Sequence, residues 1–174
     1  MNPGNLAQQI TRFMVLLLFQ VLILKRMSMG WGEVAYWNIL LYPLFILWLP
    51  VRTNPLIMLL LAFVLGLSID MFYDSPGIHA SALVFTAFVR PLVLNWMEPR
   101  EGYNLNAAPS RALFGLTGFL QYAAIMMGVH LFFYFSVDAF TFVYIADILL
   151  KTFFSFVLSM AFIAMVTLIF SPSK

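Results

Sequence analysis

The chain contains no cysteine and few charged side chains. Without a thiol it can form no disulfide, no thiolate metal site and no thiol nucleophile. Charged residues make up 9% of its 174 residues, whereas soluble domains carry about 25%. The nine basic side chains are scattered along the chain, so they form no basic face for nucleic acid.

Recognisable catalytic motifs are missing as well. The sequence has no H-E-x-x-H, no G-x-S-x-G and no Walker loop, so zinc hydrolysis, serine hydrolysis and nucleotide binding lack their usual residues. We therefore expect no catalytic residues, no cofactor, no metal ion and no nucleic-acid partner.

Apolar side chains are abundant, at 63% of the chain, and 19 of them are Phe. They form runs of about 20 residues, the length that crosses a ~30 Å hydrocarbon core. No segment alternates as a barrel strand does. The sequence predicts an all-α fold: a polytopic integral membrane helical bundle of about six transmembrane helices, forming one domain over 1–174. The expected spans are 9–27, 34–50, 54–73, 78–97, 112–136 and 146–170.

Three features of these spans carry local predictions. The first apolar run is closed by Lys25 and Arg26 rather than by a cleavage site, so we expect an uncleaved first span. The span 34–50 contains Pro43, which indicates a kink or a buried environment. The spans 54–73 and 78–97 are joined by a turn with Pro76 and Gly77 at its second and third positions, which favours a type II turn and a tight hairpin.

The orientation follows from the basic residues of the short loops. With both termini in the cytoplasm, five basic residues lie inside and three outside. The inner set is Arg12, Arg52, Arg100, Arg111 and Lys174, and the outer set is Lys25, Arg26 and Lys151. The count favours both termini on the cytoplasmic side.

Ionisable groups at the end of the third span are the first site candidates. Asp70 follows Gly66, a small residue that lets helices approach closely. Asp74 comes four residues after Asp70, on the same helix face if the helix persists that far. With His79 beyond the turn, they could form a metal site or a proton relay. The alternative is capping of the hairpin at the membrane interface.

Arg90 and Pro91 are the second candidates, because a guanidinium within an apolar span is costly. One interpretation is that Arg90 snorkels to the interface. The other is a buried contact within the bundle or with a partner helix, for which five fixed donors are suited. Pro91 leaves a backbone carbonyl unpaired and predicts a kink. His130 in the fifth span is interpreted as a hydrogen-bonded packing residue, with a catalytic role as the alternative.

The stretch from Gly66 to Ala80 resembles the signature hairpin of the rod shape-determining protein MreD family. The resemblance rests on a Gly-Leu-x-x-Asp helix end, a following aromatic residue, a short turn containing Gly77 and a helix that begins with small residues. Arg90-Pro91 looks like the form that this hairpin takes in Bacteroidetes-type members. The match covers about 26 residues. Elsewhere it rests on size and span number.

The resemblance implies a non-enzymatic scaffold in the bacterial inner membrane. Such a protein binds the membrane protein MreC and, through it, connects the MreB filament with the transpeptidase and glycosyltransferase of cell elongation. It also implies a fold similar to the substrate-binding subunits of energy-coupling-factor transporters, so a vitamin-type binding subunit is the alternative. A lipid-modifying enzyme is a third class. The candidate structural and partner-binding residues are Gly66, Asp70, Asp74, Gly77, His79, Arg90 and Pro91.

Overall fold

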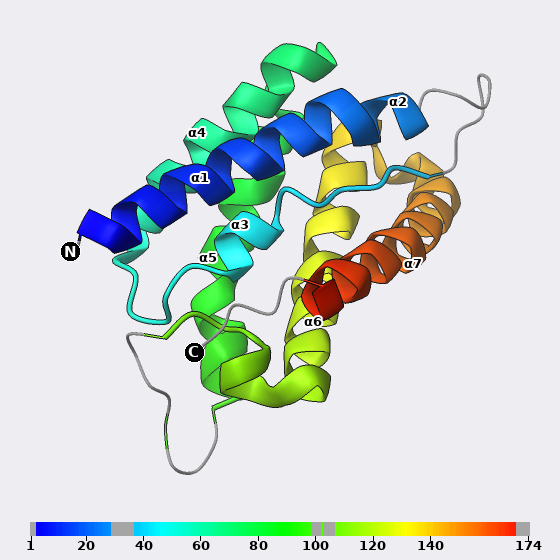
Figure 1. Ribbon diagram of the computed structural model, residues 1–174. Coiled ribbons are helices and arrows are strands. Elements are labelled where there is room, and N and C mark those ends of the chain that lie inside the picture. The colour runs from blue at the N-terminus through cyan, green and yellow to red at the C-terminus, as the bar shows by residue number, and fades with distance from the viewer. Residues whose placement is uncertain (1–2, 29–36, 99–101, 103–106, 170–174) are drawn as a thin grey trace.

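The computed structural model describes residues 3–28, 37–98, 102 and 107–169, and over these ranges every regular element is a helix (Figure 1). The chain first forms α1 (Pro3–Phe19), which continues through a π-helical turn (Gln20–Leu24) into α2 (Lys25–Ser28). The remaining elements are α3 (Leu44–Leu47), α4 (Pro55–Tyr73), α5 (Ile78–Trp96), α6 (Arg111–Ala139), a 3₁₀ turn (Phe142–Tyr144) and α7 (Ile145–Ile169).

Within the described ranges, five helices are long and apolar enough to cross a bilayer. They cover Ala7–Met27, Pro55–Tyr73, Ile78–Trp96, Arg111–Ala139 and Ile145–Ile169, close to five of the six expected spans. The prediction and the structure agree because each apolar run is long enough to cross the hydrocarbon core and must complete its own backbone hydrogen bonds as a helix. The predicted all-α polytopic bundle is confirmed, and the chain is a multi-pass membrane protein.

The expected helical span over 34–50 is wrong. Residues 34–36 lie outside the described part. Residues 37–41 have no regular secondary structure and follow an extended course before α3 (Figure 1), and the only helix among the described residues of this stretch is the single turn of α3. Pro43 has no N–H for a helical ladder and stands directly before that turn. Every residue from Ile39 to Leu47 is buried. The buried environment predicted around Pro43 is therefore confirmed, and irregular backbone is tolerated there because protein surrounds it.

The extended segment 37–41 completes one set of its hydrogen bonds with α1 and its π-helical turn. Gln20 is fully buried, and its Nε2 donates to the carbonyl of Ile39 at 2.9 Å while its Oε1 accepts from the N–H of Leu41 at 2.8 Å. These two groups point to the same side of an extended chain. One amide side chain thus serves as the neighbouring strand would in a sheet.

On the other side, α7 supplies hydroxyl groups at matching intervals. Ser155 Oγ accepts from the N–H of Asn38 at 2.8 Å, and Ser159 Oγ accepts from the N–H of Leu40 at 3.1 Å. Residues four apart lie on one helix face, and residues two apart lie on one edge of an extended chain. Two serines one helical turn apart on α7 can therefore bind the N–H groups of two alternate residues of the segment.

The segment 37–50 runs antiparallel to α1. Near its beginning it contacts Gln20, farther on Phe45 packs edge-on against Phe13 with ring centroids 5.4 Å apart, and near its end the Trp48 ring lies 5.8 Å from the Arg12 guanidinium. The helix α4 then runs parallel to α1. Over the described residues the chain thus crosses the bundle five times as a long helix and once as the segment 37–50, called the extended crossing below, in which extended residues 37–41 lead into the single helical turn of α3 (Figure 1).

Candidate functional site

Asp70 lies at the end of α4, where its buried carboxylate caps the beginning of the next helix, α5. Oδ1 accepts from the backbone N–H of His79 at 2.9 Å, and Oδ2 accepts from the backbone N–H of Ala80 at 2.9 Å. Oδ1 also accepts from Ser75 Oγ at 2.8 Å and lies 2.9 Å from His79 Nδ1. The first turn of a helix has unpaired N–H groups and a positive dipole end. The carboxylate satisfies two of those donors, so the hairpin-capping interpretation agrees with this geometry.

The α4–α5 turn explains why one helix can cap the other. Gly77 has φ 83° and ψ 7°, the dihedral angles that the third position of a type II turn requires, as predicted. As the residue before α5, Gly77 has no side chain for the helix N-terminus, and Asp70 takes that place.

Asp74 does not join the site. Helix α4 ends at Tyr73, and Asp74 follows in the left-handed conformation with φ 53° and an exposed side chain. The expected shared face of Asp70 and Asp74 is therefore wrong, because the helix does not persist that far. Ser75, which sequence reasoning missed, supplies the contact instead.

Gly66 allows the two helices to approach at this point. A Cβ atom there would lie 2.4 Å from the Cα of Ala80 and 2.9 Å from the carbonyl oxygen of His79. No side chain fits, so the close approach predicted for Gly66 is present. The contact brings the N–H groups of α5 within reach of the carboxylate one turn later on α4.

His79 is fully buried among three tyrosine rings. Its ring centroid lies 5.6 Å from that of Tyr42, 4.7 Å from that of Tyr73 and 4.9 Å from that of Tyr134. Nδ1 faces Asp70, while Nε2 has no hydrogen-bond partner in the part of the chain that the structure describes. Among the side chains of Asp70, Ser75 and His79, this nitrogen is the one polar atom without a hydrogen bond.

His130 forms a second buried centre between α5, α6 and the segment 37–50. Thr86 donates its hydroxyl proton to the carbonyl of Ala82 at 2.7 Å, so it accepts from His130 Nδ1 at 2.8 Å. His130 Nε2 is then the acceptor, and the Tyr42 hydroxyl donates to it at 2.8 Å. Both nitrogens of a neutral imidazole are satisfied, which agrees with the packing role predicted for His130.

Arg90 is buried rather than snorkelling, at 1% exposure. Its Nε donates to the Tyr122 hydroxyl at 3.0 Å, and one terminal nitrogen donates to the carbonyl oxygens of Leu49 and Pro50. The other terminal nitrogen lies 3.4 Å from the Met58 sulfur. Among the described residues no carboxylate is within ion-pair distance of Arg90. The guanidinium therefore caps the carbonyl end of the extended crossing, and the buried-contact interpretation is confirmed.

Pro91 lies inside α5, which continues to Trp96. A proline at 91 has no N–H, so the carbonyl of Ala87 lacks its usual helical donor, and the kink predicted there stays a prediction. Pro91 is placed directly beside Arg90, at the level where that side chain leaves α5 for the segment 49–50.

Two cavities lie elsewhere in the described part of the chain, and neither is lined by Asp70, His79, Arg90 or His130. One, of about 330 Å³, lies at the α6–α7 turn and is lined by Asp138, Asp147 and Lys151 among others. The other, of about 580 Å³, is apolar and lies between α2 and α7. Over the described ranges no three His, Cys, Asp or Glu side chains are grouped as metal ligands would be.

The buried polar side chains thus bind one another and the backbone. Asp70 and Arg90 each complete the unpaired end of a neighbouring segment, and Gln20, Ser155 and Ser159 complete the extended crossing. No family model, no curated protein and no solved structure matches this chain.

Proposed function

We propose that the protein is a non-enzymatic scaffold of the bacterial cell-elongation machinery, similar to MreD. The observation that carries the proposal is how the MreD-like hairpin uses its polar residues. Asp70 hydrogen-bonds the start of α5, and Arg90 hydrogen-bonds the carbonyls before α4. Both hold the hairpin in shape, and neither faces a described cavity. A rigid hairpin with apolar outer faces suits the packing of a partner helix.

The proposed location is the bacterial inner membrane, with both termini in the cytoplasm. The proposed partner is an MreC-type membrane protein that links the chain indirectly to the MreB filament and to the elongation transpeptidase and glycosyltransferase. Exposed apolar residues on the hairpin are available for helix contact, for example Leu60 on α4 and Phe88 on α5, which are 55% and 64% exposed. Membrane lipid covers the remaining apolar surface.

A vitamin-type binding subunit of a transporter is the second candidate function. It is favoured by the unpaired Nε2 of His79, which lies buried among Tyr42, Tyr73 and Tyr134 in the first turn of α5. Buried polar groups without partners are typical of sites that receive a ligand. The close ring contacts around His79 argue against it, because they leave little space.

Affinity purification of a tagged copy in mild detergent separates the two functions. Mass spectrometry would identify both the proteins and the small molecules that accompany it. Recovery of an MreC-type protein and wall synthases supports the scaffold. A stoichiometric vitamin together with transporter ATPases would refute the scaffold and support the transporter subunit. A Leu60→Arg variant should lose the protein partner if that face of α4 binds it, whereas Leu149→Arg on α7 is the matched control.

A further inference from the structure

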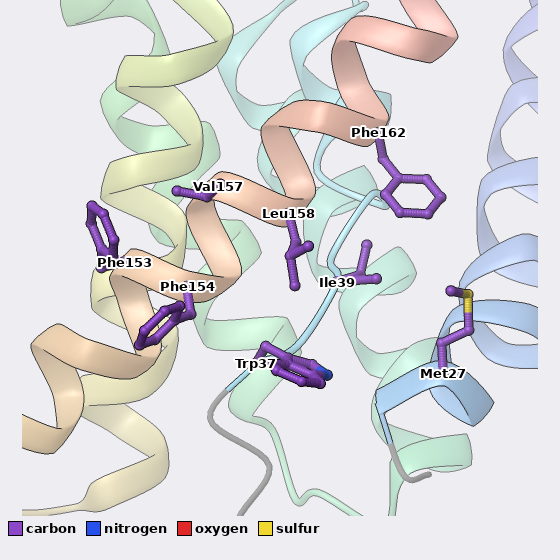
Figure 2. Close-up of a pocket in the computed structure, with 8 residues that line it drawn as sticks. All are labelled: Met27, Trp37, Ile39, Phe153, Phe154, Val157, Leu158 and Phe162. Atoms are coloured by element: carbon purple, nitrogen blue, oxygen red, sulfur yellow. The ribbon is translucent and has the colours of Figure 1, made fainter. Parts of the chain in front are cut away.

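The extended crossing leaves a gap in the bundle. A helix with its side chains is about 10–12 Å wide, whereas an extended chain occupies only about 5 Å beside its neighbour. Where residues 37–39 stand between α2 and α7, the difference remains as a cavity of about 580 Å³ (Figure 2). Met27 forms one wall, Trp37 and Ile39 form the floor, and α7 forms the other wall with Phe154 and four further apolar residues.

The chemistry of the lining identifies the kind of occupant. Every side chain that lines the cavity is hydrocarbon, aromatic or thioether, apart from the indole nitrogen of Trp37. Several are about half exposed, including Met27 at 48%, Phe154 at 45% and Val157 at 50%, so the cavity is a groove on the outside of the bundle. A polar small molecule would find no convergent donors there. Empty apolar space forfeits dispersion contacts, so hydrocarbon should fill it.

The volume distinguishes a lipid chain from a partner helix. One turn of a helix, ~5.4 Å high and ~11 Å wide, fills about 500 Å³, so the groove would take little more than one turn. A methylene group has about the volume of a water molecule in the liquid, ~30 Å³, so the groove would hold about 19 of them. That number is close to the length of one phospholipid acyl chain.

A basic residue at the end of the first crossing directly precedes Met27, which lines the groove. This residue, Arg26, is exposed and lies in the last turn of α2. A guanidinium is well suited to a phosphate group. Trp37 lies at the same end, where indole rings commonly mark the membrane interface. The groove and Arg26 thus offer an acyl site and a phosphate site in the order in which a phospholipid carries these groups.

We propose that this groove binds a single phospholipid, with one acyl chain along Ile39, Phe154 and Leu158 and its phosphate group at Arg26. The lipid takes the space that a helical second crossing would have filled. It covers the outer side of the extended segment and replaces the missing helix contacts between α2 and α7. The proposal does not depend on the scaffold function.

Photo-crosslinking with a phosphatidylglycerol that carries a diazirine within its acyl chain tests the site. The whole protein is reconstituted in vesicles of phosphatidylethanolamine and this lipid, illuminated, digested and mapped by mass spectrometry. We expect crosslinks concentrated at 37–39 and 153–162. Leu158→Trp should reduce them at least fivefold, whereas Leu60→Trp on the exposed face of α4 should not. Equal labelling of α4 and α7 would show annular lipid only and overturn the proposal.

Native mass spectrometry after detergent exchange supplies the second measurement. The wild-type protein should retain one phospholipid, and Arg26→Gln should lower its occupancy, whereas Arg52→Gln, an exposed arginine before α4, should leave it unchanged. If Leu158→Trp does not fold, Val157→Trp fills the same groove from a half-exposed position. A lipid-free wild-type protein, or retention that neither groove variant changes, contradicts the site.

Discussion

Replacement of Asp70 by asparagine tests the hairpin cap with almost no change in size. The amide oxygen can still accept from His79, but its NH₂ group then faces the N–H of Ala80 in place of Oδ2. One buried backbone donor loses its acceptor, which costs about 1–3 kcal/mol. Loss of the negative charge at a helix N-terminus costs about 1 kcal/mol more. We therefore expect Asp70→Asn to lower the free energy of unfolding by about 2–4 kcal/mol.

The assay is thermal unfolding of the purified protein in mild detergent. For a chain of this length each kcal/mol shifts the melting temperature by about 2–4 °C, so the expected loss is about 4–16 °C. Asp74→Asn is the matched control, because that carboxylate is exposed and lies outside the cap. Its melting temperature should stay close to that of the wild-type protein. Equal shifts in the two variants would refute the capping role of Asp70.

Three further substitutions test other contacts by the same melting measurement. Gly66→Ala should destabilise the protein, because its Cβ would lie 2.4 Å from the backbone of α5. This clash outweighs the better helix propensity of alanine. Gly128→Ala is the control and should be neutral or stabilising, because its Cβ would lie 4.0 Å from the nearest atom. Gln20→Leu should cost about 2–4 kcal/mol by leaving two buried backbone groups unpaired, and the exposed Gln121→Leu should not. Arg90→Lys should lower the melting temperature, because an ammonium cannot reach the tyrosine and both carbonyls together.

Each of these has a result that would count against it. A Gly66→Ala protein at least as stable as the wild type would mean that α4 and α5 separate easily. Indistinguishable Gln20→Leu and Gln121→Leu proteins would mean that the extended crossing does not need its side-chain partner. A fully stable Arg90→Lys protein would show that charge alone suffices at that position.

The sequence predicted the five long helices closely because each is a run of apolar residues that must satisfy its own backbone. The extended crossing could not be predicted from the sequence, because the side chains that complete its backbone hydrogen bonds lie far away in the chain. These side chains are Gln20, Ser155 and Ser159. The sequence does contain part of the evidence for this crossing. Gln20 interrupts an otherwise apolar run, and the two serines are four residues apart on one helix face. Only the packed bundle shows that they meet the same segment.

The candidate site could also be predicted only in part from the sequence. Asp70, Gly66 and Gly77 could be placed together from their spacing, since the turn fixes where α5 begins relative to α4. The burial of Arg90 could be named only as one of two alternatives, because its acceptors at Leu49 and Pro50 belong to the segment whose form was not foreseen.

The most direct test of the account is which side of the membrane each loop faces. The chain contains no cysteine, so single cysteines can be introduced without removing native ones and labelled in intact cells with a membrane-impermeant maleimide. Because the segment 37–50 crosses the bundle, Gly4→Cys before the first crossing and Arg52→Cys before α4 should be protected alike, while Asp74→Cys is labelled from outside. Labelling of positions 4 and 52 from opposite sides would contradict the extended second crossing and the six-crossing fold.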